Sequence, residues 1–167
     1  MNTQLAMYLS TNTVDPDALY TVWGGANDIF AVTDPTTAPT IIGQAVGSEV
    51  GIVSQLEAAG AKYVMVATVP DIGLTPAYAG PNSVLGTQLT TSYNDALFSS
   101  LAAAGLRVIP LDTFHLLQEI VSNPGLYGFT NTTTPACGAV SSQLCSPLDY
   151  VAPDVSGYGS DGGVHPT

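Results

Sequence analysis

The stretch Trp23-Gly-Gly-Ala-Asn-Asp-Ile-Phe30 directly follows a short apolar run, Leu19–Trp23, and decides how this chain begins to fold. A run of β-branched and aromatic residues that ends in glycine is typical of a strand that leaves its sheet through a tight turn. Asn27 stands close after Gly24 and Gly25, where the backbone can approach a bound molecule. The pattern therefore predicts a strand followed by a turn, from which the Asn27 amide can bind a developing oxyanion.

The last seven residues, Asp161-Gly-Gly-Val-His-Pro-Thr167, hold the second group with chemical potential. Histidine is the side chain whose charge changes near neutral pH, so His165 is a candidate general base. A nearby carboxylate can orient such a ring, and Asp161 stands four positions before His165. Two outcomes stay open: the glycines between them let the carboxylate reach the ring, or the orienting hydrogen bond is lost.

Together the two stretches resemble two of the short blocks that define the SGNH, or GDSL-type, hydrolases. Three segments between them, in the same order, resemble passenger domains of autotransporter-type esterases: Val69–Pro76, Arg107–Asp112 and Asn123–Thr130. The resemblance implies that Asn27, with Gly25 beside it, belongs to the oxyanion-binding block. It also implies that His165 is the general base, although the family spaces its Asp and His one position closer than Asp161 and His165 stand here.

The family's nucleophile is a serine in a Gly-Asp-Ser block, which attacks the ester carbonyl and forms an acyl-enzyme that water then hydrolyses. No Gly-Asp-Ser occurs in this chain. Ser48 and Ser160 each follow a glycine, but neither lies in a Gly-x-Ser-x-Gly elbow. The resemblance thus favours a carboxylic ester hydrolase (esterase or lipase) whose nucleophile is not identifiable in this chain. The alternative is a non-catalytic fragment or binding protein that retains the fold.

The fold implied by the resemblance is a three-layer, flavodoxin-like α/β sandwich with a parallel sheet. We expect a single partial domain over residues 1–167 that lacks the first two strands of the family's sheet. Leu19–Trp23 would then be an exposed, apolar sheet edge. We expect a homodimer, or pairing with a missing N-terminal piece, to cover this edge.

The hydrophobic pattern alternates short apolar runs with helical periodicity, which is typical of a parallel βαβ arrangement. The predicted strands are Leu19–Trp23, Tyr63–Thr68 and Arg107–Leu111. The predicted helices are Met1–Ser10, a segment from about Ile41 to Gly60, Ser83–Ala104 and Thr113–Asn123. From Gly125 onward we expect mostly loop.

The chain is strongly acidic, with 13 Asp and Glu against 2 Lys and Arg, for a formal net charge of −11. This balance argues against nucleic acid or an anionic membrane surface as a partner, because both select for basic patches. It is compatible with a neutral or cationic small-molecule or lipid ester.

No apolar run reaches the length of a membrane-spanning helix. No glycine motif that binds phosphates or nucleotides occurs either, so we expect no cofactor.

Two cysteines, Cys137 and Cys145, lie close together in a segment rich in Ser, Thr and Pro. A structural zinc site would need a second pair of ligands, which the chain does not offer, so we expect no metal. A local disulfide is favoured instead, and it implies an oxidising compartment. We therefore expect the protein to be secreted, periplasmic or displayed on a bacterial cell surface.

Overall fold

The computed structural model describes residues 2–160 and 162 and shows an α/β fold around a small parallel sheet. The described strands are β1 (Leu19–Val22), β2 (Tyr63–Ala67) and β3 (Ile109–Leu111), in the order β1-β2-β3. All three expected strands are confirmed, although the third begins at Ile109 rather than Arg107. The parallel α/β architecture expected from the sequence is therefore confirmed.

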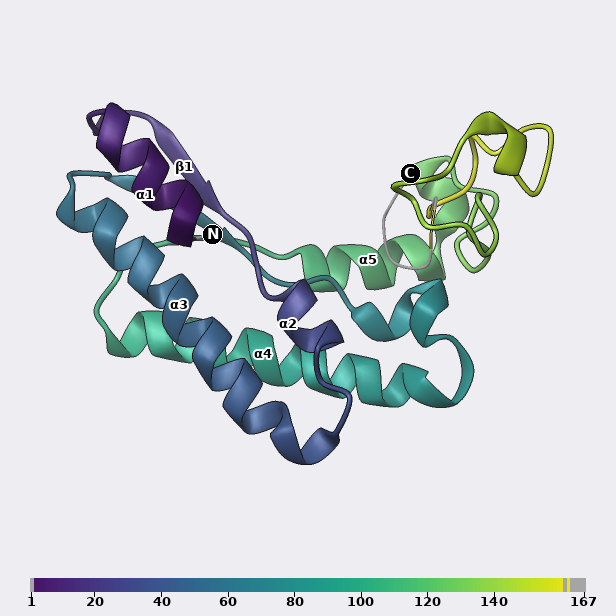
Figure 1. The fold of residues 1–167 in the computed structure, drawn as a ribbon, viewed down its shortest axis with the longest axis horizontal. Helices are drawn as coiled ribbons and strands as arrows, with labels where there is room; N and C mark the ends of the chain where they lie inside the picture. Colours follow the sequence, from purple (N-terminus) through teal and green to yellow (C-terminus); the bar gives the residue numbers. More distant parts are fainter. Residues whose placement is uncertain (1, 161, 163–167) are drawn as a thin grey trace. The chain divides into compact units, whose positions relative to one another are not determined.

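Helices connect and flank the strands (Figure 1). They are α1 (Asn2–Thr11), α2 (Ala26–Phe30), α3 (Ala38–Ala58), α4 (Ser83–Ala103) and α5 (Thr113–Ser122). Four of them were expected and are confirmed. The remaining helix, α2, corrects the sequence interpretation, which placed Asn27 in a turn. A short helix that contains Asn27 begins directly after Gly25. No helix among residues 2–160 is long and apolar enough to cross a membrane.

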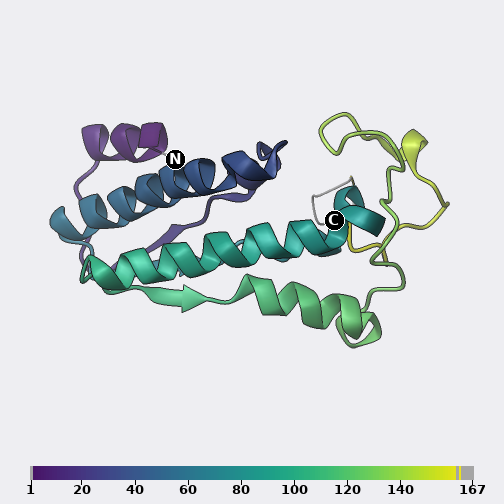
Figure 2. The ribbon, with the colours of Figure 1, turned by 90° about the horizontal axis from the view of Figure 1, so that it is seen from below.

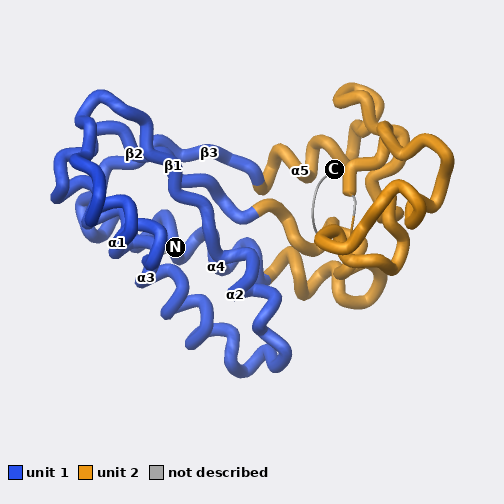
Figure 3. The backbone as a smooth tube through the Cα atoms, turned by 45° about the horizontal axis from the view of Figure 1, so that its top comes forward, with its two compact units in different colours: residues 1–69, 89–113 blue, residues 70–88, 114–167 orange. Residues whose placement is uncertain are grey.

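The chain divides into two compact units (Figure 3). The first comprises Met1–Val69 and Leu89–Thr113, and so contains the sheet. The second comprises Pro70–Gln88 and Phe114–Thr167, and contains most of α5 and the loops that follow it. The expectation of a single domain over residues 1–167 stays a prediction.

In the first unit, one face of the sheet is buried against helices. The register pairs Tyr20 with Val64 and Val22 with Val66, and paired residues of parallel strands share a face. Val22, Val64 and Val66 are buried, and α3 contacts both β1 and β2. Figure 2 shows α3 and α4 running beside each other, and a hydrogen bond between their side chains joins them.

The opposite face of the sheet leaves large apolar side chains exposed. Leu19 pairs with Tyr63 on this face, and these side chains are 52% and 49% exposed. Ile109 and Leu111 of β3 continue the face and are also exposed. Parallel sheets normally carry cover on both faces, so this apolar face is unusual for its class.

In the second unit, a buried aspartate organises the segment after β2. Asp71 is 2% exposed, and its Oδ1 accepts from the Gly73 N–H at 3.1 Å and the Thr87 hydroxyl at 2.7 Å. Its Oδ2 accepts from the Gln118 side-chain amide at 2.8 Å. Both carboxylate oxygens are therefore satisfied, and they join a 3₁₀ turn, the start of α4 and α5.

Beyond α5 the second unit consists mainly of turns and short 3₁₀ helices, as expected. Cys137 and Cys145 form a disulfide, which confirms the expected pairing. Cys137 is buried with Ala136 beside it, and the Ala136 backbone bonds to both Ser160 and Val151. The disulfide therefore closes a loop that the backbone also holds in place.

Candidate active site

The candidate site lies in the first unit, where the three strands end. Trp23, after β1, donates its indole N–H to the carbonyl of Thr68, after β2, at 3.2 Å. Thr113, after β3, donates its backbone N–H to the Thr68 hydroxyl at 2.9 Å. The carboxyl ends of the strands are thus tied together at one edge. In open parallel sheets this is the edge where ligands bind.

Gly25 sets the direction in which the chain leaves β1. It has φ 94° and ψ −28°, a left-handed conformation that favours glycine, and it precedes α2. Its carbonyl accepts from the Ile29 N–H at 3.0 Å, which closes the first turn of that helix. A side chain at position 25 would overlap the ring of Tyr93. Two independent constraints therefore require glycine here.

Asn27 lies in the first turn of α2, two residues after Gly25, and is exposed. Its backbone carbonyl accepts from the Ala31 N–H, as in an ordinary helix. Its side-chain amide makes no hydrogen bond to any other residue among those described.

A buried glutamate and tyrosine, joined by a hydrogen bond, lie next to this turn, and the sequence interpretation missed them. Glu49 of α3 and Tyr93 of α4 are both fully buried, and the Tyr93 hydroxyl donates to Glu49 Oε2 at 2.7 Å. Glu49 Oε1 has no hydrogen-bond partner within the described part of the chain. Burial raises the pKa of Glu49 and the nearby charge of Asp28 raises it further, while the hydrogen bond from Tyr93 opposes this shift.

The sequence did contain a signal for Glu49. The buried residues of α3 recur at helical spacing: Ile42, Ala45, Val46, Glu49, Ile52, Val53 and Leu56. Glu49 occupies an inward position in this series, where a charged residue is rare. A charged residue at the core position of an amphipathic helix therefore marks a buried polar contact.

Asn94, next to Tyr93 on α4, holds the chain where it leaves β2. Its side-chain oxygen accepts from the Val69 N–H at 2.8 Å, and its amide donates to the Val69 carbonyl at 2.9 Å. Both residues are buried. Asn94 thus supplies the two backbone hydrogen bonds that Val69 would otherwise lack.

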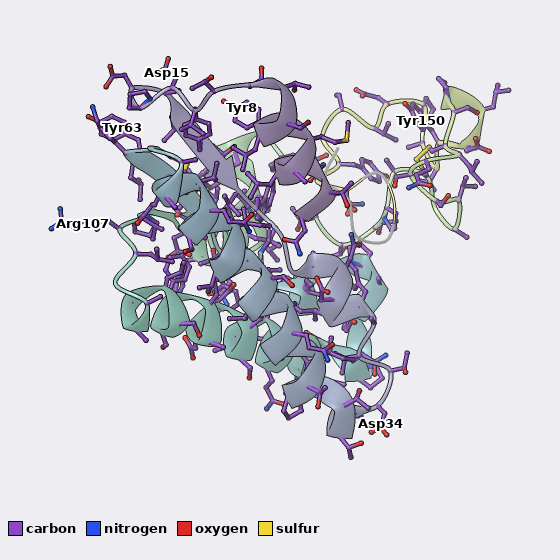
Figure 4. All side chains as sticks on the ribbon, turned by 60° about the vertical axis from the view of Figure 1, so that its left-hand side comes forward. Tyr8, Asp15, Asp34, Tyr63, Arg107 and Tyr150 are labelled. Atoms are coloured by element: carbon purple, nitrogen blue, oxygen red, sulfur yellow. A yellow bond between two sulfur atoms is a disulfide. The ribbon has the colours of Figure 1, made fainter. Side chains whose placement is uncertain are left out.

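The positive charges of the chain lie at the other end of the strands. Its two Lys and Arg residues are Lys62, just before β2, and Arg107, just before β3. Figure 4 shows Tyr63 and Arg107 projecting outward on the same side of the chain. Lys62 forms an ion pair of 3.2 Å with Asp17, which itself lies just before β1. Lys62 and Arg107 therefore both precede strands, and neither lies at the carboxyl edge of the sheet.

The remaining candidate residues lie elsewhere in the sequence. Asp161 and His165 fall outside the described residues, so the described structure brings together only Gly25 and Asn27 of the expected set. Ser160 is buried and its hydroxyl donates to the Gly162 carbonyl at 2.5 Å. Ser48 lies within α3, not at a strand-to-helix elbow. Among the described residues, no three His, Cys, Asp or Glu side chains gather as a metal site would require.

Known proteins are similar to this chain over most of its length. The chain matches the GDSL-like lipase/acylhydrolase family over residues 2–167. Esterase EstA of Pseudomonas aeruginosa is 35% identical over 161 residues, which cover 92% of this chain and 24% of the relative. Esterase EstA of Pseudomonas putida gives the same values.

An acetylesterase of Thermothelomyces thermophilus is 30% identical over 150 residues, covering 87% of this chain and 44% of the relative. The chain therefore spans about a quarter of the length of the EstA relatives and under half of the acetylesterase. The family match nevertheless extends over almost every residue of the chain, including both stretches that the sequence singled out. With a parallel α/β fold and this match in agreement, the chain belongs to the GDSL-like lipase/acylhydrolase family.

Proposed function

We propose that this chain supplies the oxyanion donor and the general base of a carboxylic ester hydrolase. The observation that carries the proposal is the exposed Asn27 amide at the carboxyl edge of the sheet, where no lysine or arginine stands. A neutral donor aimed at a developing oxyanion contributes roughly 10²–10³ in rate. Asn27 fills this role, and Gly25 provides the turn that places it.

In the proposed reaction, a serine hydroxyl attacks the ester carbonyl carbon and passes its proton to the His165 imidazole. The carbonyl oxygen gains negative charge and is held by the Asn27 amide. The bond between the carbonyl carbon and the leaving alcohol oxygen then breaks as His165 gives its proton to that alcohol oxygen. Water next attacks the acyl-enzyme in the same way and releases the acid. Asp161 orients His165 in this scheme.

The nucleophilic serine is the part that this chain does not identify, since it contains no Gly-Asp-Ser. This observation favours a second candidate function, a non-catalytic binding protein that keeps the fold and the Asn27 turn. The two functions differ in what the purified chain does to an ester. One hydrolyses it and the other only binds it.

Turnover of p-nitrophenyl acetate and butyrate separates the candidates. For an ester hydrolase we expect His165→Ala and Asn27→Ala each to lower kcat by about 10²-fold or more, because each removes a group that acts in the transition state. Leu148→Ala, at a 96% exposed position in the second unit, is the matched control and should leave kcat unchanged. Wild-type turnover no higher than that of His165→Ala would instead favour the binding protein.

The charge and the disulfide extend the proposal to substrate and location. A net charge of −11 repels anionic esters, so we propose a neutral or cationic ester, small or lipid-like, as substrate. The Cys137–Cys145 disulfide supports an extracellular or periplasmic site of action, because such bonds persist in oxidising compartments. No nucleic acid partner is proposed.

The open edge of the sheet supports a proposal about assembly. Within the described residues β1 pairs only with β2. A groove of about 250 Å³ is lined by residues of α1, β1 and α3, which include Leu5, Tyr8, Tyr20 and Leu56. We propose that a second copy of the chain covers this edge and the apolar sheet face in a two-fold dimer.

Light scattering tests the dimer. Leu19→Lys places a charge on the exposed end of the edge strand without removing core packing, and we expect it to shift the chain toward monomer. Leu116→Lys, at a similarly exposed position on α5, is the matched control and should leave the mass unchanged. A wild-type chain that is monomeric at high concentration would contradict the assembly.

A further inference from the structure

The buried Glu49 carboxyl has no role in the proposed reaction, yet the fold retains it at a cost. It is fully buried, one of its oxygens accepts from the Tyr93 hydroxyl, and the other has no partner among the described residues. Burying a carboxyl with incomplete hydrogen bonding costs free energy that an apolar side chain of similar size would not. Such a group therefore needs an explanation beyond packing.

The contacts of Tyr93 supply one. Its ring fills the space that a side chain at Gly25 would occupy, and its hydroxyl is held by Glu49 at the end of the ring. The hydrogen bond fixes both the depth and the direction of the ring, which apolar packing alone fixes less tightly. The ring in turn sets the position of the turn that it covers.

The same turn carries the oxyanion donor. Gly25 precedes α2, its carbonyl accepts from Ile29, and Asn27 lies in the helical turn that this hydrogen bond closes. Ile29 is fully buried, so α2 is anchored on its inner side while Asn27 faces outward. A continuous path of contacts thus runs from Glu49 through Tyr93 to Gly25, two residues before Asn27.

We propose that Glu49 and Tyr93 are positioning residues, which hold the Gly25 turn and thereby aim the Asn27 amide at the carboxyl edge of the sheet. The aim of an oxyanion donor matters because misplacement by about 1 Å can cost roughly 10²-fold in rate. This inference rests on the proposed role of Asn27, but the state of the turn can be measured without any turnover.

Amide hydrogen exchange provides that measurement. The Ile29 and Ala31 amides donate to the carbonyls of Gly25 and Asn27, so their exchange reports opening of the turn. Tyr93→Phe keeps the ring but removes the hydroxyl, and we expect exchange at these two amides to rise by about tenfold, the equivalent of one hydrogen bond. Glu49→Gln keeps an acceptor oxygen for Tyr93 and should restore exchange to within about threefold of wild type.

A second variant and an internal reference keep the test decisive. Glu49→Leu leaves the Tyr93 hydroxyl without its acceptor and must raise exchange at Ile29 and Ala31 as Tyr93→Phe does. The amides of β2, residues Tyr63–Ala67, report the stability of the whole unit. If they accelerate by the same factor, or if Ile29 and Ala31 do not accelerate, the pair is only a stability element and the proposal is overturned.

Turnover separates this inference from the proposed function. In a chain that hydrolyses p-nitrophenyl esters, Tyr93→Phe should lower kcat with little change in KM, and Glu49→Gln should retain most of the activity. Equal kcat values for wild type and Tyr93→Phe would contradict the positioning role. A wild-type chain without turnover would contradict the proposed function, while the exchange at Ile29 and Ala31 would still decide whether the pair holds the turn.

Discussion

Among the described residues, each unit buries one carboxyl group, Glu49 in the first and Asp71 in the second, and the two differ in their hydrogen bonding. Asp71 accepts three hydrogen bonds, which satisfy both of its oxygens. Glu49 accepts one, on one oxygen only. Equal burial therefore says little about the role of an acid. Asp71 bonds to three segments of the chain, whereas Glu49 bonds only to Tyr93 among the described residues.

The difference also appears in what each residue leaves behind when it is removed. Without Asp71, a backbone N–H, a hydroxyl and a side-chain amide lose their acceptor inside the second unit. Without the Glu49 carboxyl, one hydroxyl does. Because each hydrogen bond contributes about 1 kcal/mol, the loss of three should exceed the loss of one, although Thr87 and Gln118 are only half-buried.

A large effect is expected of Asp71→Ala. We expect the free energy of unfolding to fall by about 3 kcal/mol, because three donors lose their acceptor and each hydrogen bond contributes about 1 kcal/mol. Asp71→Asn retains one acceptor oxygen and should cost clearly less. Urea denaturation at neutral pH measures both variants. A loss under about 1 kcal/mol for Asp71→Ala would contradict the view that its three hydrogen bonds hold the second unit together.

Gly25→Ala tests whether the Tyr93 ring, held by Glu49, can move to make room for a methyl group at position 25. A left-handed alanine costs about 1–2 kcal/mol, and overpacking against Tyr93 adds about 1–3 kcal/mol. Gly43→Ala is the matched control, since Gly43 is an exposed helical glycine with open space around it. It should gain up to about 1 kcal/mol. In thermal unfolding, a loss from Gly25→Ala no larger than about 1–2 kcal/mol, the cost of the backbone strain alone, would show that the Tyr93 ring moves aside easily.

The pH dependence of stability sharpens the comparison on the Glu49 side. Its pKa is raised in the folded chain, chiefly by burial, above an ordinary value of 4.5. The stability that it contributes is therefore fully present below that ordinary value and is lost as the pH rises through the raised one. Relative to Glu49→Gln, wild type should lose more than about 0.5 kcal/mol, the range of surface substitutions, between pH 4 and neutral pH. Parallel curves for the two proteins would contradict this expectation.

The smallest expected effect is that of Asn27→Ala on stability. Asn27 is exposed, and exposed side chains outside special contacts usually change stability within about ±0.5 kcal/mol. The same chemical denaturation series measures it. A loss of several kcal/mol would assign Asn27 to the architecture of the turn rather than to a ligand.

Sequence reasoning recovered the strands and long helices because their apolar residues repeat at regular spacing. It missed α2, because Ala26–Phe30 is too short to show a helical period. It also missed the bond from Tyr93 to Glu49, which joins residues 44 positions apart, since no local pattern encodes such a contact. The placement of Asn27 at the end of β1 followed from the motif, whereas the roles of Asp161 and His165 stay predictions.

The placement of Lys62 and Arg107 ahead of the strands also bears on how a reaction product would leave. Ester hydrolysis turns a neutral substrate into a carboxylate anion. At the carboxyl edge that anion would meet no lysine or arginine, and Asp28 stands beside Asn27 there. Without a lysine or arginine at this edge, no permanent positive charge holds the anion there. In the proposed enzyme, the released acid would therefore diffuse away readily and inhibit weakly as it accumulates.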